Sequence, residues 1–335
     1  MTHDHDHDHG DDETAEDVRP RVRAMQSLLT EAGIVSQDAI DEAIAAYEED
    51  IGPLNGARVV ARAWTDPDFE ERLLDDANAA IEEFDFDVGV QHISVKKNTE
   101  TTHNTVVCTL CSCYPWSVLG LPPTWYKTPA YRSRMVREPR SVLAEFGTSL
   151  DDAMDIEVWD SSSELRYMVL PRQPPGTEDL TEDELVDIVT RDAMIGVERL
   201  DQAAADGGRP VPRTSAAHTV ISELLGEDDP VFTAPWQART FGIAVALRDA
   251  AEAINWPDFQ ARLIDAVDET PSDAYEGNNR AAAARETYYE QWSTALERLL
   301  VHEGLLDAAA VQERAAAFAN GERTAEEFVR GDRGH

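Results

Sequence analysis

Lysine is the scarcest charged residue of this chain. Only Lys96, Lys97 and Lys127 occur among its 29 basic residues, against 66 acidic residues, which gives a formal net charge of −37. This charge repels phosphate backbones and anionic lipid headgroups, so nucleic acid and an acidic membrane are excluded as partners. Such a composition is typical of a cytoplasmic protein adapted to high salt, where screening tolerates the self-repulsion. An ordinary acidic enzyme is the alternative.

Long apolar segments are also missing. No hydrophobic run has the length of a membrane span, and the N-terminus lacks the apolar core of a signal peptide. The sequence therefore predicts a cytoplasmic protein with no membrane partner. Hydrophobic residues still make up 42% of the chain, which is enough for a sizeable core. The length of 335 residues indicates two domains.

The chain has three cysteines, and all of them lie within six positions, at Cys108, Cys111 and Cys113. A disulfide would pair two of them and leave the third alone, and a tetrathiolate zinc or iron–sulfur site needs a fourth cysteine that the sequence lacks. Unrelated buried thiols would normally be scattered along the chain. The clustering therefore predicts that the three sulfurs bind one metal ion.

Backbone groups can complete this ligand set. The amide nitrogens of Ser112 and Cys113 lie between the second and third sulfurs of the Cys-x-x-Cys-x-Cys turn. Three sulfurs and two deprotonated amides would give five ligands and leave a sixth octahedral position open. This strongly donating set suits a small trivalent ion better than tetrahedral zinc, and the open position permits Lewis-acid chemistry.

The segment Cys-Thr-Leu-Cys-Ser-Cys-Tyr-Pro-Trp at 108–116 resembles the metal-binding motif of the nitrile hydratase α subunit. The resemblance extends over roughly residues 20 to 205, far beyond a short motif. The residues that carry it are 47–48, 52–53, 55–64, 106–116, 118–123, 125–127, 131–134, 136–140 and 142–147.

This resemblance implies an enzyme that hydrates nitriles to amides at a non-corrin cobalt(III) or non-haem iron(III) ion. By position, Cys108, Cys111 and Cys113 would be the sulfur ligands, and Ser112 and Cys113 would supply amide nitrogens. The family also implies that Cys111 is oxidised to a sulfinate and Cys113 to a sulfenate, which is the catalytic group as nucleophile or as base. Position 109 is threonine, as in the cobalt type of the family, where the iron type usually has serine, so the resemblance favours cobalt(III) over iron(III).

Oxidised sulfurs place further demands on the site. Their anionic oxygens, in a partly desolvated pocket, need strong donors or counter-charges. In the family two arginines of the β subunit supply them, so the resemblance implies a β-subunit partner. Arg132, Arg134 and Arg137 follow the cysteines and are either further counter-charges or members of ordinary ion pairs and helix surfaces.

Three residues are candidates for the substrate pocket. Tyr114 and Trp116 follow the cysteines and are expected to line a pocket for a small nitrile, with simple packing around Pro115 as the alternative. Gln91 is a candidate on the resemblance alone. His92 and His103 are interpreted as surface or packing residues, because five metal ligands are already assigned.

Composition divides the chain into segments. Residues 1–17 carry His3, His5, His7 and His9 alternating with aspartate and have nothing to bury, so they are expected to form a disordered tail with incidental metal affinity. Residues 18–205 are predicted to form an α-subunit-like domain, with a helical arm at 18–85 and a metal-binding α+β domain at 86–205. Residues 206–230 read as a linker and 231–330 as a small all-helical domain.

Periodicity predicts the elements within these segments. Helices are expected within 18–50, with Ser36 at an N-cap, within 55–83, with a break near Asp66-Pro67, and over 180–189. Strands are expected at 90–95, 104–107, 156–160 and 165–170, the last two joined by a serine turn. The fold class is therefore α+β, with the cysteines on a loop between elements.

Residues 231–330 resemble the N-terminal helical part of the nitrile hydratase β subunit, and equally the small accessory (activator) protein that helps to insert the metal. Their aromatic residues are predicted to pack in a core rather than to take part in catalysis. The arginines that the family draws from the rest of the β subunit are not evident in the chain, so a separate β chain is expected.

Three functions are compatible with these observations. The leading hypothesis is the α part of a cobalt nitrile hydratase, a hydro-lyase, fused to a helical module. The equivalent subunit of thiocyanate hydrolase shares the cysteines, but Trp116 favours the nitrile enzyme, since arginine there would suit an anionic substrate. The third is a metal-delivery or maturation protein, which would bind cobalt without turnover.

Overall fold

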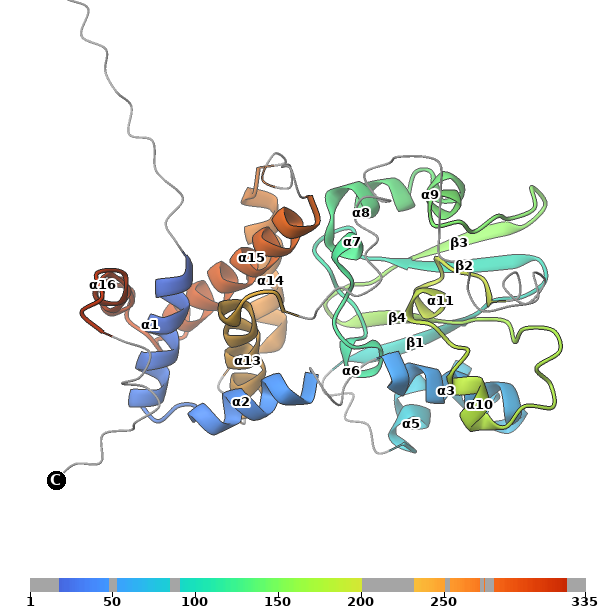
Figure 1. Cartoon of the computed structure of the whole chain (residues 1–335), viewed down its shortest axis with the longest axis horizontal. Coiled ribbons are helices and arrows are strands. Elements are labelled where there is room, and N and C mark those ends of the chain that lie inside the picture. Colours follow the sequence, from blue (N-terminus) through green and yellow to red (C-terminus); the bar gives the residue numbers. More distant parts are fainter. Residues whose placement is uncertain are drawn as a thin grey trace, which may run out of the picture.

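Two bodies lie side by side in the computed structural model, one helical and one α+β (Figure 1). The structure describes residues 18–47, 53–84, 91–200, 232–250, 254–271, 274 and 280–323. The predicted tail at 1–17 and the predicted linker at 206–230 lie outside these residues. Within the described ranges, no helix has the length and apolar character that a membrane span requires.

The helical body combines segments from both ends of the chain. It consists of α1 (Val18–Glu31), α2 (Gln37–Ala45), α13 (Pro235–Asp249), α14 (Trp256–Glu269), α15 (Arg280–His302) and α16 (Ala308–Ala319). Helix α1 packs on α16, α2 on α13, and α14 on α15. The predicted N-cap is confirmed, because the Ser36 hydroxyl accepts a hydrogen bond from the Ala39 amide at 3.0 Å.

Two short parallel sheets form the centre of the α+β body. Strand β1 (His92–Lys97) pairs with β4 (Leu165–Leu170), and β2 (Thr102–Val107) pairs with β3 (Asp155–Asp160). The strands on either side of the serine turn are therefore not partners of each other. Parallel partners need a crossover connection. The chain leaves the sheet after β2 and returns at β3, and the cysteine loop begins this crossover.

Short helices surround the sheets. They are α3 (Pro53–Thr65), α4 (Pro67–Asp75), α5 (Ala77–Glu82), α6 (Trp116–Leu119), α7 (Thr124–Lys127), α8 (Pro129–Met135), α9 (Pro139–Glu145), α10 (Glu182–Val186) and α11 (Arg191–Ile195). The predicted break after α3 is confirmed, because Asp66 caps α4 by accepting from the Phe69 amide at 3.1 Å. Helix α3 packs on α6 and α10, and α5 packs on β1.

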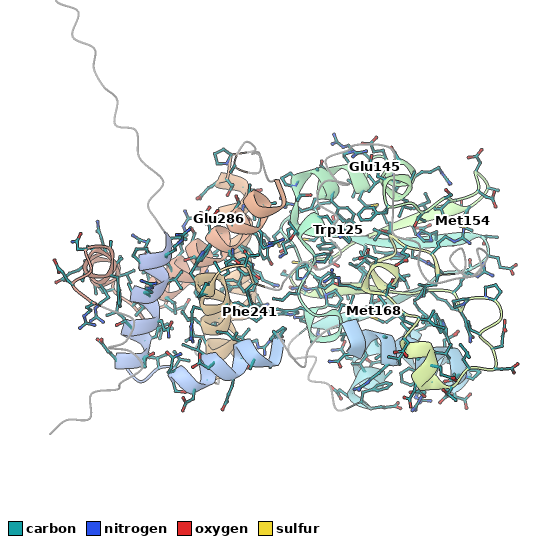
Figure 2. All side chains as sticks on the ribbon, in the orientation of Figure 1. Trp125, Glu145, Met154, Met168, Phe241 and Glu286 are labelled. Atoms are coloured by element: carbon teal, nitrogen blue, oxygen red, sulfur yellow. The ribbon has the colours of Figure 1, made fainter. Side chains whose placement is uncertain are left out.

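The two bodies share a continuous apolar core. Phe241 of the helical body and Met168 of the α+β body are both fully buried (Figure 2), and the buried side chains between them form one cluster. At the contact, the ring of Trp116 in α6 stacks on Trp256 in α14, with centroids 5.1 Å apart. The loop that carries the cysteines directly precedes α6 and so lies beside this contact.

Candidate metal centre

The three cysteine sulfurs converge in the structure. Cys108 Sγ lies 3.8 Å from Cys111 Sγ, which in turn lies 3.4 Å from Cys113 Sγ. All three side chains are buried, and their sulfurs lie within 4.8 Å of one another. Among the described residues, no second group of three histidine, cysteine or carboxylate side chains converges in this way.

Strand pairing positions the start of the cysteine loop. The parallel register sets Val107, the last residue of β2, opposite Asp160 at the end of β3. The Asp160 carboxylate accepts from the Thr109 amide at 2.9 Å and from the Thr109 hydroxyl at 2.6 Å. Because β3 follows the crossover, the residue that holds the loop lies about fifty positions away in sequence.

Two side chains of the crossover helices hold the rest of the loop. The Tyr126 hydroxyl donates to the Cys113 carbonyl at 2.9 Å, and Arg132 Nη1 donates to the Leu110 carbonyl at 3.0 Å. Tyr126 is fully buried and Arg132 nearly so. These two bonds tie the loop, at Leu110 and at Cys113, to the helices that follow it.

The three cysteine thiols also shift one another's pKa values. Hydrogen bonds from Cys111 and Cys113 lower the pKa of Cys108 to about 2, against the opposing effect of burial. Hydrogen bonding with Cys108 raises the pKa of Cys111 to about 12, and bonds with Cys108 and Cys111 raise the pKa of Cys113 well above its ordinary value. One thiolate is thus stabilised by two thiols, and a bound cation would displace the remaining protons.

A cavity lies beside the sulfurs, where the two bodies meet. Its volume is about 40 Å³, and it opens partly to solvent. The Ser112 hydroxyl donates to the Tyr288 hydroxyl at 3.0 Å, so α15 reaches the cysteine loop directly. The lining residues are Cys111, Ser112, Cys113, Tyr114, Trp116, Leu121, Pro122 and Arg166 of the α+β body, and Trp256, Phe259, Gln260, Leu263, Tyr288 and Trp292 of the helical body.

The structure brings two of the three predicted pocket residues to this cavity. Tyr114 and Trp116 line it, whereas Gln91 is buried but is not among the lining residues. The Gln91 carbonyl accepts from Asn78 Nδ2 at 2.7 Å, and within the described part of the chain the side-chain Oε1 of Gln91 has no hydrogen-bond partner. Gln91 directly precedes β1, which belongs to the sheet that does not carry the cysteine loop.

The helical body supplies lining residues that the sequence did not assign to the site. Trp256, Phe259 and Gln260 lie on one face of α14, and Tyr288 and Trp292 lie one turn apart on α15. Their helical spacing predicts a buried face and is compatible with core packing. It carries no information on what that face covers. Arg166 of β4 was missed as well.

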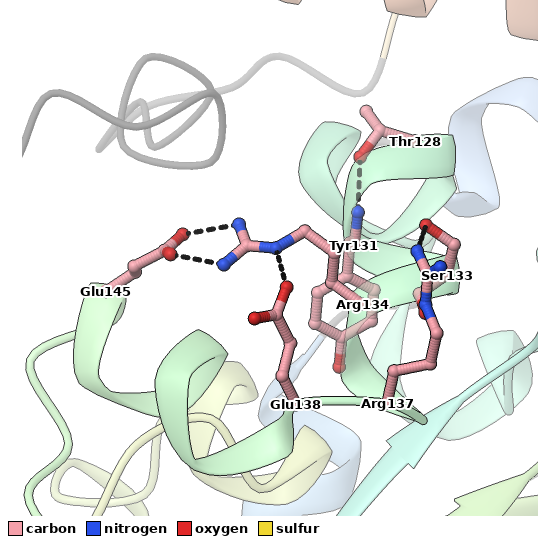
Figure 3. Close-up of polar contacts among 7 residues, drawn as sticks. All are labelled: Thr128, Tyr131, Ser133, Arg134, Arg137, Glu138 and Glu145. Carbon is pink, nitrogen blue, oxygen red and sulfur yellow. Dashed lines mark hydrogen bonds and ion pairs between the residues drawn. The ribbon is translucent and has the colours of Figure 1, made fainter.

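Arg134 and Arg137 are not among the residues that line the cavity, and their side chains bind Glu138, Glu145 and Ser133 instead (Figure 3). Arg134 donates to both carboxylate oxygens of Glu145, at 3.0 and 2.6 Å, and to Glu138 at 2.5 Å. Arg137 donates to the Ser133 carbonyl at 2.9 Å within its own helical segment. For these two residues the prediction of ion pairs and helix-surface packing is confirmed.

The donor set fits a transition-metal ion. Thiolate sulfurs bind soft or borderline metals, and all the cysteines of the chain are used here. The backbone is also turned inward, since the Cys111 amide lies 3.3 Å from Cys108 Sγ. A loop with three buried, converging cysteine sulfurs, next to a cavity on an α+β body, defines a thiolate-ligated metalloprotein.

The comparison with protein families specifies which one. The model of the nitrile hydratase alpha chain matches residues 16–198, and the chain belongs to this family. The model of the nitrile hydratase beta subunit N-terminal region matches residues 216–333. Two parts that are named after separate subunits therefore lie in one chain.

Individual relatives agree with this assignment. The low-molecular weight cobalt-containing nitrile hydratase subunit alpha of Rhodococcus rhodochrous is 56% identical over 184 residues, which are 54% of this chain and 88% of the relative. The thiocyanate hydrolase subunit gamma of Thiobacillus thioparus is 41% identical over 187 residues, 52% of this chain and 76% of the relative. A solved Fe-type nitrile hydratase mutant from Comamonas testosteroni Ni1 superimposes with a TM-score of 0.53 at 41% identity, covering 58% of this chain and 95% of that one.

Proposed function

We propose that this chain is the α subunit of a cobalt nitrile hydratase, which hydrates nitriles to amides, and that it carries part of the β subunit in the same chain. The observation that carries the proposal is the convergence of three buried sulfurs within 4.8 Å at the edge of a cavity. Cys108, Cys111 and Cys113 would be the sulfur ligands, and Ser112 and Cys113 would add amide nitrogens.

Cobalt is the metal that the relatives and the sequence support. The Rhodococcus rhodochrous relative is named cobalt-containing, and Thr109 fits the same type. A trivalent cobalt ion would supply Lewis-acid activation of a nitrile or of water at its open position. Cys111 as a sulfinate and Cys113 as a sulfenate would carry the anionic oxygens, with Cys113 as the nucleophile or base.

The chain's own residues would bind and orient the substrate. Trp116, Trp256 and Trp292 line the cavity with large apolar surfaces and limit the access of water. This environment suits the hydrocarbon part of a small nitrile and strengthens electrostatic interactions near the sulfurs. Tyr288 fixes Ser112, whose amide belongs to the proposed ligand set, through the hydroxyl bond at 3.0 Å.

The proposal includes a partner chain. The match to the β-subunit family covers the N-terminal region of that subunit, and the family resemblance supports a β-subunit partner that supplies arginines to the oxidised sulfurs. The complex would be a hetero-oligomer. Reduced thiols must persist until the metal arrives, which favours assembly in the cytoplasm, and the acidic composition favours a high-salt one.

A thiocyanate hydrolase subunit is the second candidate, supported by the 41% identical gamma subunit. Trp116 lies in the cavity and presents an apolar ring to the substrate space. This residue supports a neutral nitrile over an anion.

The test is to express the chain alone and with a nitrile hydratase β subunit, in medium that contains cobalt. Metal content, oxygen atoms on the cysteine peptide and conversion of acetonitrile or thiocyanate would be measured. We expect cobalt, oxidised cysteines and acetamide in the co-expressed complex. Zinc with unmodified thiols would contradict the proposal, cobalt and oxidised thiols without turnover would indicate a metal-delivery role, and turnover of thiocyanate alone would favour the second candidate.

Replacing one sulfur tests the ligand set itself. Cys108→Ala should lower cobalt from about one ion per chain to a trace, because two thiolates cannot hold the ion against competing water and buffer. Elemental analysis of the purified chain measures this. Ser117→Ala is the matched control, since the Ser117 hydroxyl is buried in α6 and the described residues offer it no hydrogen-bond partner. An unchanged cobalt content in Cys108→Ala would remove Cys108 from the ligand set.

A further inference from the structure

Arg166 is a buried cation on the wall of the metal cavity. It is the second residue of β4, pairs with Ile93 of β1 in the parallel register, and is only 2% exposed. It lines the same cavity as Cys111 and Cys113. A guanidinium group in such a position loses nearly all of its hydration.

The contacts of Arg166 satisfy only part of its guanidinium group. Gln260 of α14, with its amide oriented to satisfy both ends, accepts from Arg166 Nη2 and from Trp256 Nε1 at 3.2 Å, and donates to the Ser163 carbonyl at 3.0 Å. Arg166 Nε and Nη1 are buried and find no hydrogen-bond partner among the described residues. Within the described parts of the chain, Arg166 forms no ion pair with a carboxylate, unlike Arg134 or Arg314.

A buried, unpaired guanidinium is costly, because the energy lost on leaving water is not returned by a neutral partner. An anion that accepts a charge-assisted hydrogen bond from one of the free N–H groups returns part of it. The cysteine loop borders the cavity through Cys111 and Cys113, whose sulfurs would carry negative charge once the loop is metallated and oxidised. Arg132 is not an alternative, since it donates to the Leu110 carbonyl and is not among the lining residues.

We propose that Arg166 is an anion-binding residue of the cavity, aimed by Gln260 at negative charge that is carried either by the cysteine sulfurs or by a small anion that enters the cavity. The first source rests on the proposed function, since it requires a metal-loaded and oxidised loop, whereas the second does not. The chain would in either case supply a positive charge to the site from its own strand β4, in addition to any that a partner supplies.

The first arm of the test uses the metal-free, reduced, full-length chain and thiocyanate as the anion probe. Binding would be followed through tryptophan fluorescence, because Trp116, Trp256 and Trp292 line the cavity. If a free anion is the ligand, Arg166→Met should weaken thiocyanate binding by at least about tenfold, and Arg166→Lys should weaken it less. Arg140→Met is the matched control, since Arg140 binds the Leu150, Asp151 and Met154 carbonyls outside the cavity.

The second arm loads the same variants with cobalt in air and counts cobalt ions and oxygen atoms on the cysteine peptide by mass spectrometry. If the sulfurs are the ligand, Arg166→Met should lose oxygen atoms and bound cobalt, while Arg140→Met should match the wild type. Circular dichroism melting checks that each variant is folded. If Arg166→Met does not fold, the comparison is made with Arg166→Lys. The proposal is overturned if the Arg166 variants match the wild type in both arms. A wild type that binds thiocyanate through Arg166 but takes up no cobalt would defeat the proposed function and leave this inference standing.

Discussion

The hydrogen bond between Ser112 and Tyr288 joins the cysteine loop to the helical body. Both hydroxyls are buried, and their oxygens are 3.0 Å apart. The Tyr288 ring also forms a cation–π contact with the buried side chain of Lys127, whose Nζ lies 4.3 Å from the ring centroid. Burial, with the nearby positive charge of Arg285, lowers the pKa of Lys127 to about 7. Tyr288 is therefore fixed on two sides.

A double-mutant cycle measures this bond. Ser112→Ala and Tyr288→Phe should each lower the free energy of unfolding by about 0.5–1.5 kcal/mol, and the double variant should lose less than the sum, because each single change leaves one buried hydroxyl unpaired. Urea unfolding of the metal-free chain gives the values. Tyr114→Phe is the control, since the Tyr114 hydroxyl is buried beside the same cavity and no described residue forms a hydrogen bond with it. Additive losses from Ser112→Ala and Tyr288→Phe would show that the bond contributes nothing.

The residues of the site differ in how far the sequence predicts them. Cys108, Cys111 and Cys113 are adjacent in the chain, so their convergence follows from a short turn. Tyr288 and Arg166 reach the cavity only through tertiary packing, at positions 176 and 54 residues from Ser112. The local sequence around a single tyrosine in a helix, or a single arginine in a strand, does not indicate that the residue will contact a segment so far away in the chain.

At the scale of elements, α11 is joined tightly to the strand that leads into the cysteine loop. Gly196 ends α11 with φ of +88°, and its carbonyl shares a hydrogen bond of 2.8 Å with His103 Nε2 on β2. This buried contact agrees with the prediction that His103 is a packing residue. A side chain on Gly196 would place Cβ 2.1 Å from the Asn104 carbonyl and 2.8 Å from Thr105 Cα. Both atoms belong to backbone and cannot rotate away.

Gly196→Ala should therefore force α11 and β2 apart. We expect a loss of about 2–5 kcal/mol in the free energy of unfolding, from the left-handed backbone and the overpacking together, with lower cobalt uptake because β2 leads into Cys108. Gly147→Ala is the matched control: its φ is +82°, but nothing lies within 4 Å of the added Cβ. That variant should lose only about 1–2 kcal/mol. Equal losses in the two variants, by chemical denaturation, would contradict the packing argument.

Strand positions were predictable, but their pairing was not. Alternation predicts strands at 156–160 and 165–170, and the structure has β3 at Asp155–Asp160 and β4 at Leu165–Leu170. The short serine turn between them favours a hairpin. Each strand instead finds a parallel partner some 50 to 75 residues earlier, because those pairings bury residues such as Met168 and Val106. Local patterns do not encode that choice.

At the scale of the whole molecule, charged side chains connect the first and last described helices. Glu31 at the end of α1 accepts from Arg314 of α16 through both carboxylate oxygens, at 2.7 and 2.9 Å, and from Arg323 at 3.1 Å. The Arg314 hydrogen bonds, followed by those of Arg323, lower the pKa of Glu31 to about 2. Its carboxylate therefore stabilises the fold above the ordinary pKa of 4.5, and this contribution is lost as the pH falls toward 2.

Glu31→Gln should reduce stability at pH 7 by about 0.5–1 kcal/mol, since the side chain is half exposed and solvent screens the pair. The difference from the wild type should shrink between pH 4.5 and 2, and also in molar salt. Thermal melts across that pH range measure it. Glu313→Gln is the control, because Glu313 is exposed on α16 and forms no ion pair within the described residues. A difference that stays constant down to pH 2 would assign the effect to another group.

The covalent connection between the two bodies changes how the cysteine loop is covered. Where an α part and a β part are separate polypeptides, dilution separates them; here residues 201–231 tie the helical body to the loop that it contacts. Tethering of this kind gives a local concentration on the order of millimolar, whatever the protein concentration outside. The Tyr288 side of the cavity should thus remain in place in a single isolated molecule. Coverage of the metal site by the helical body should therefore not depend on the protein concentration.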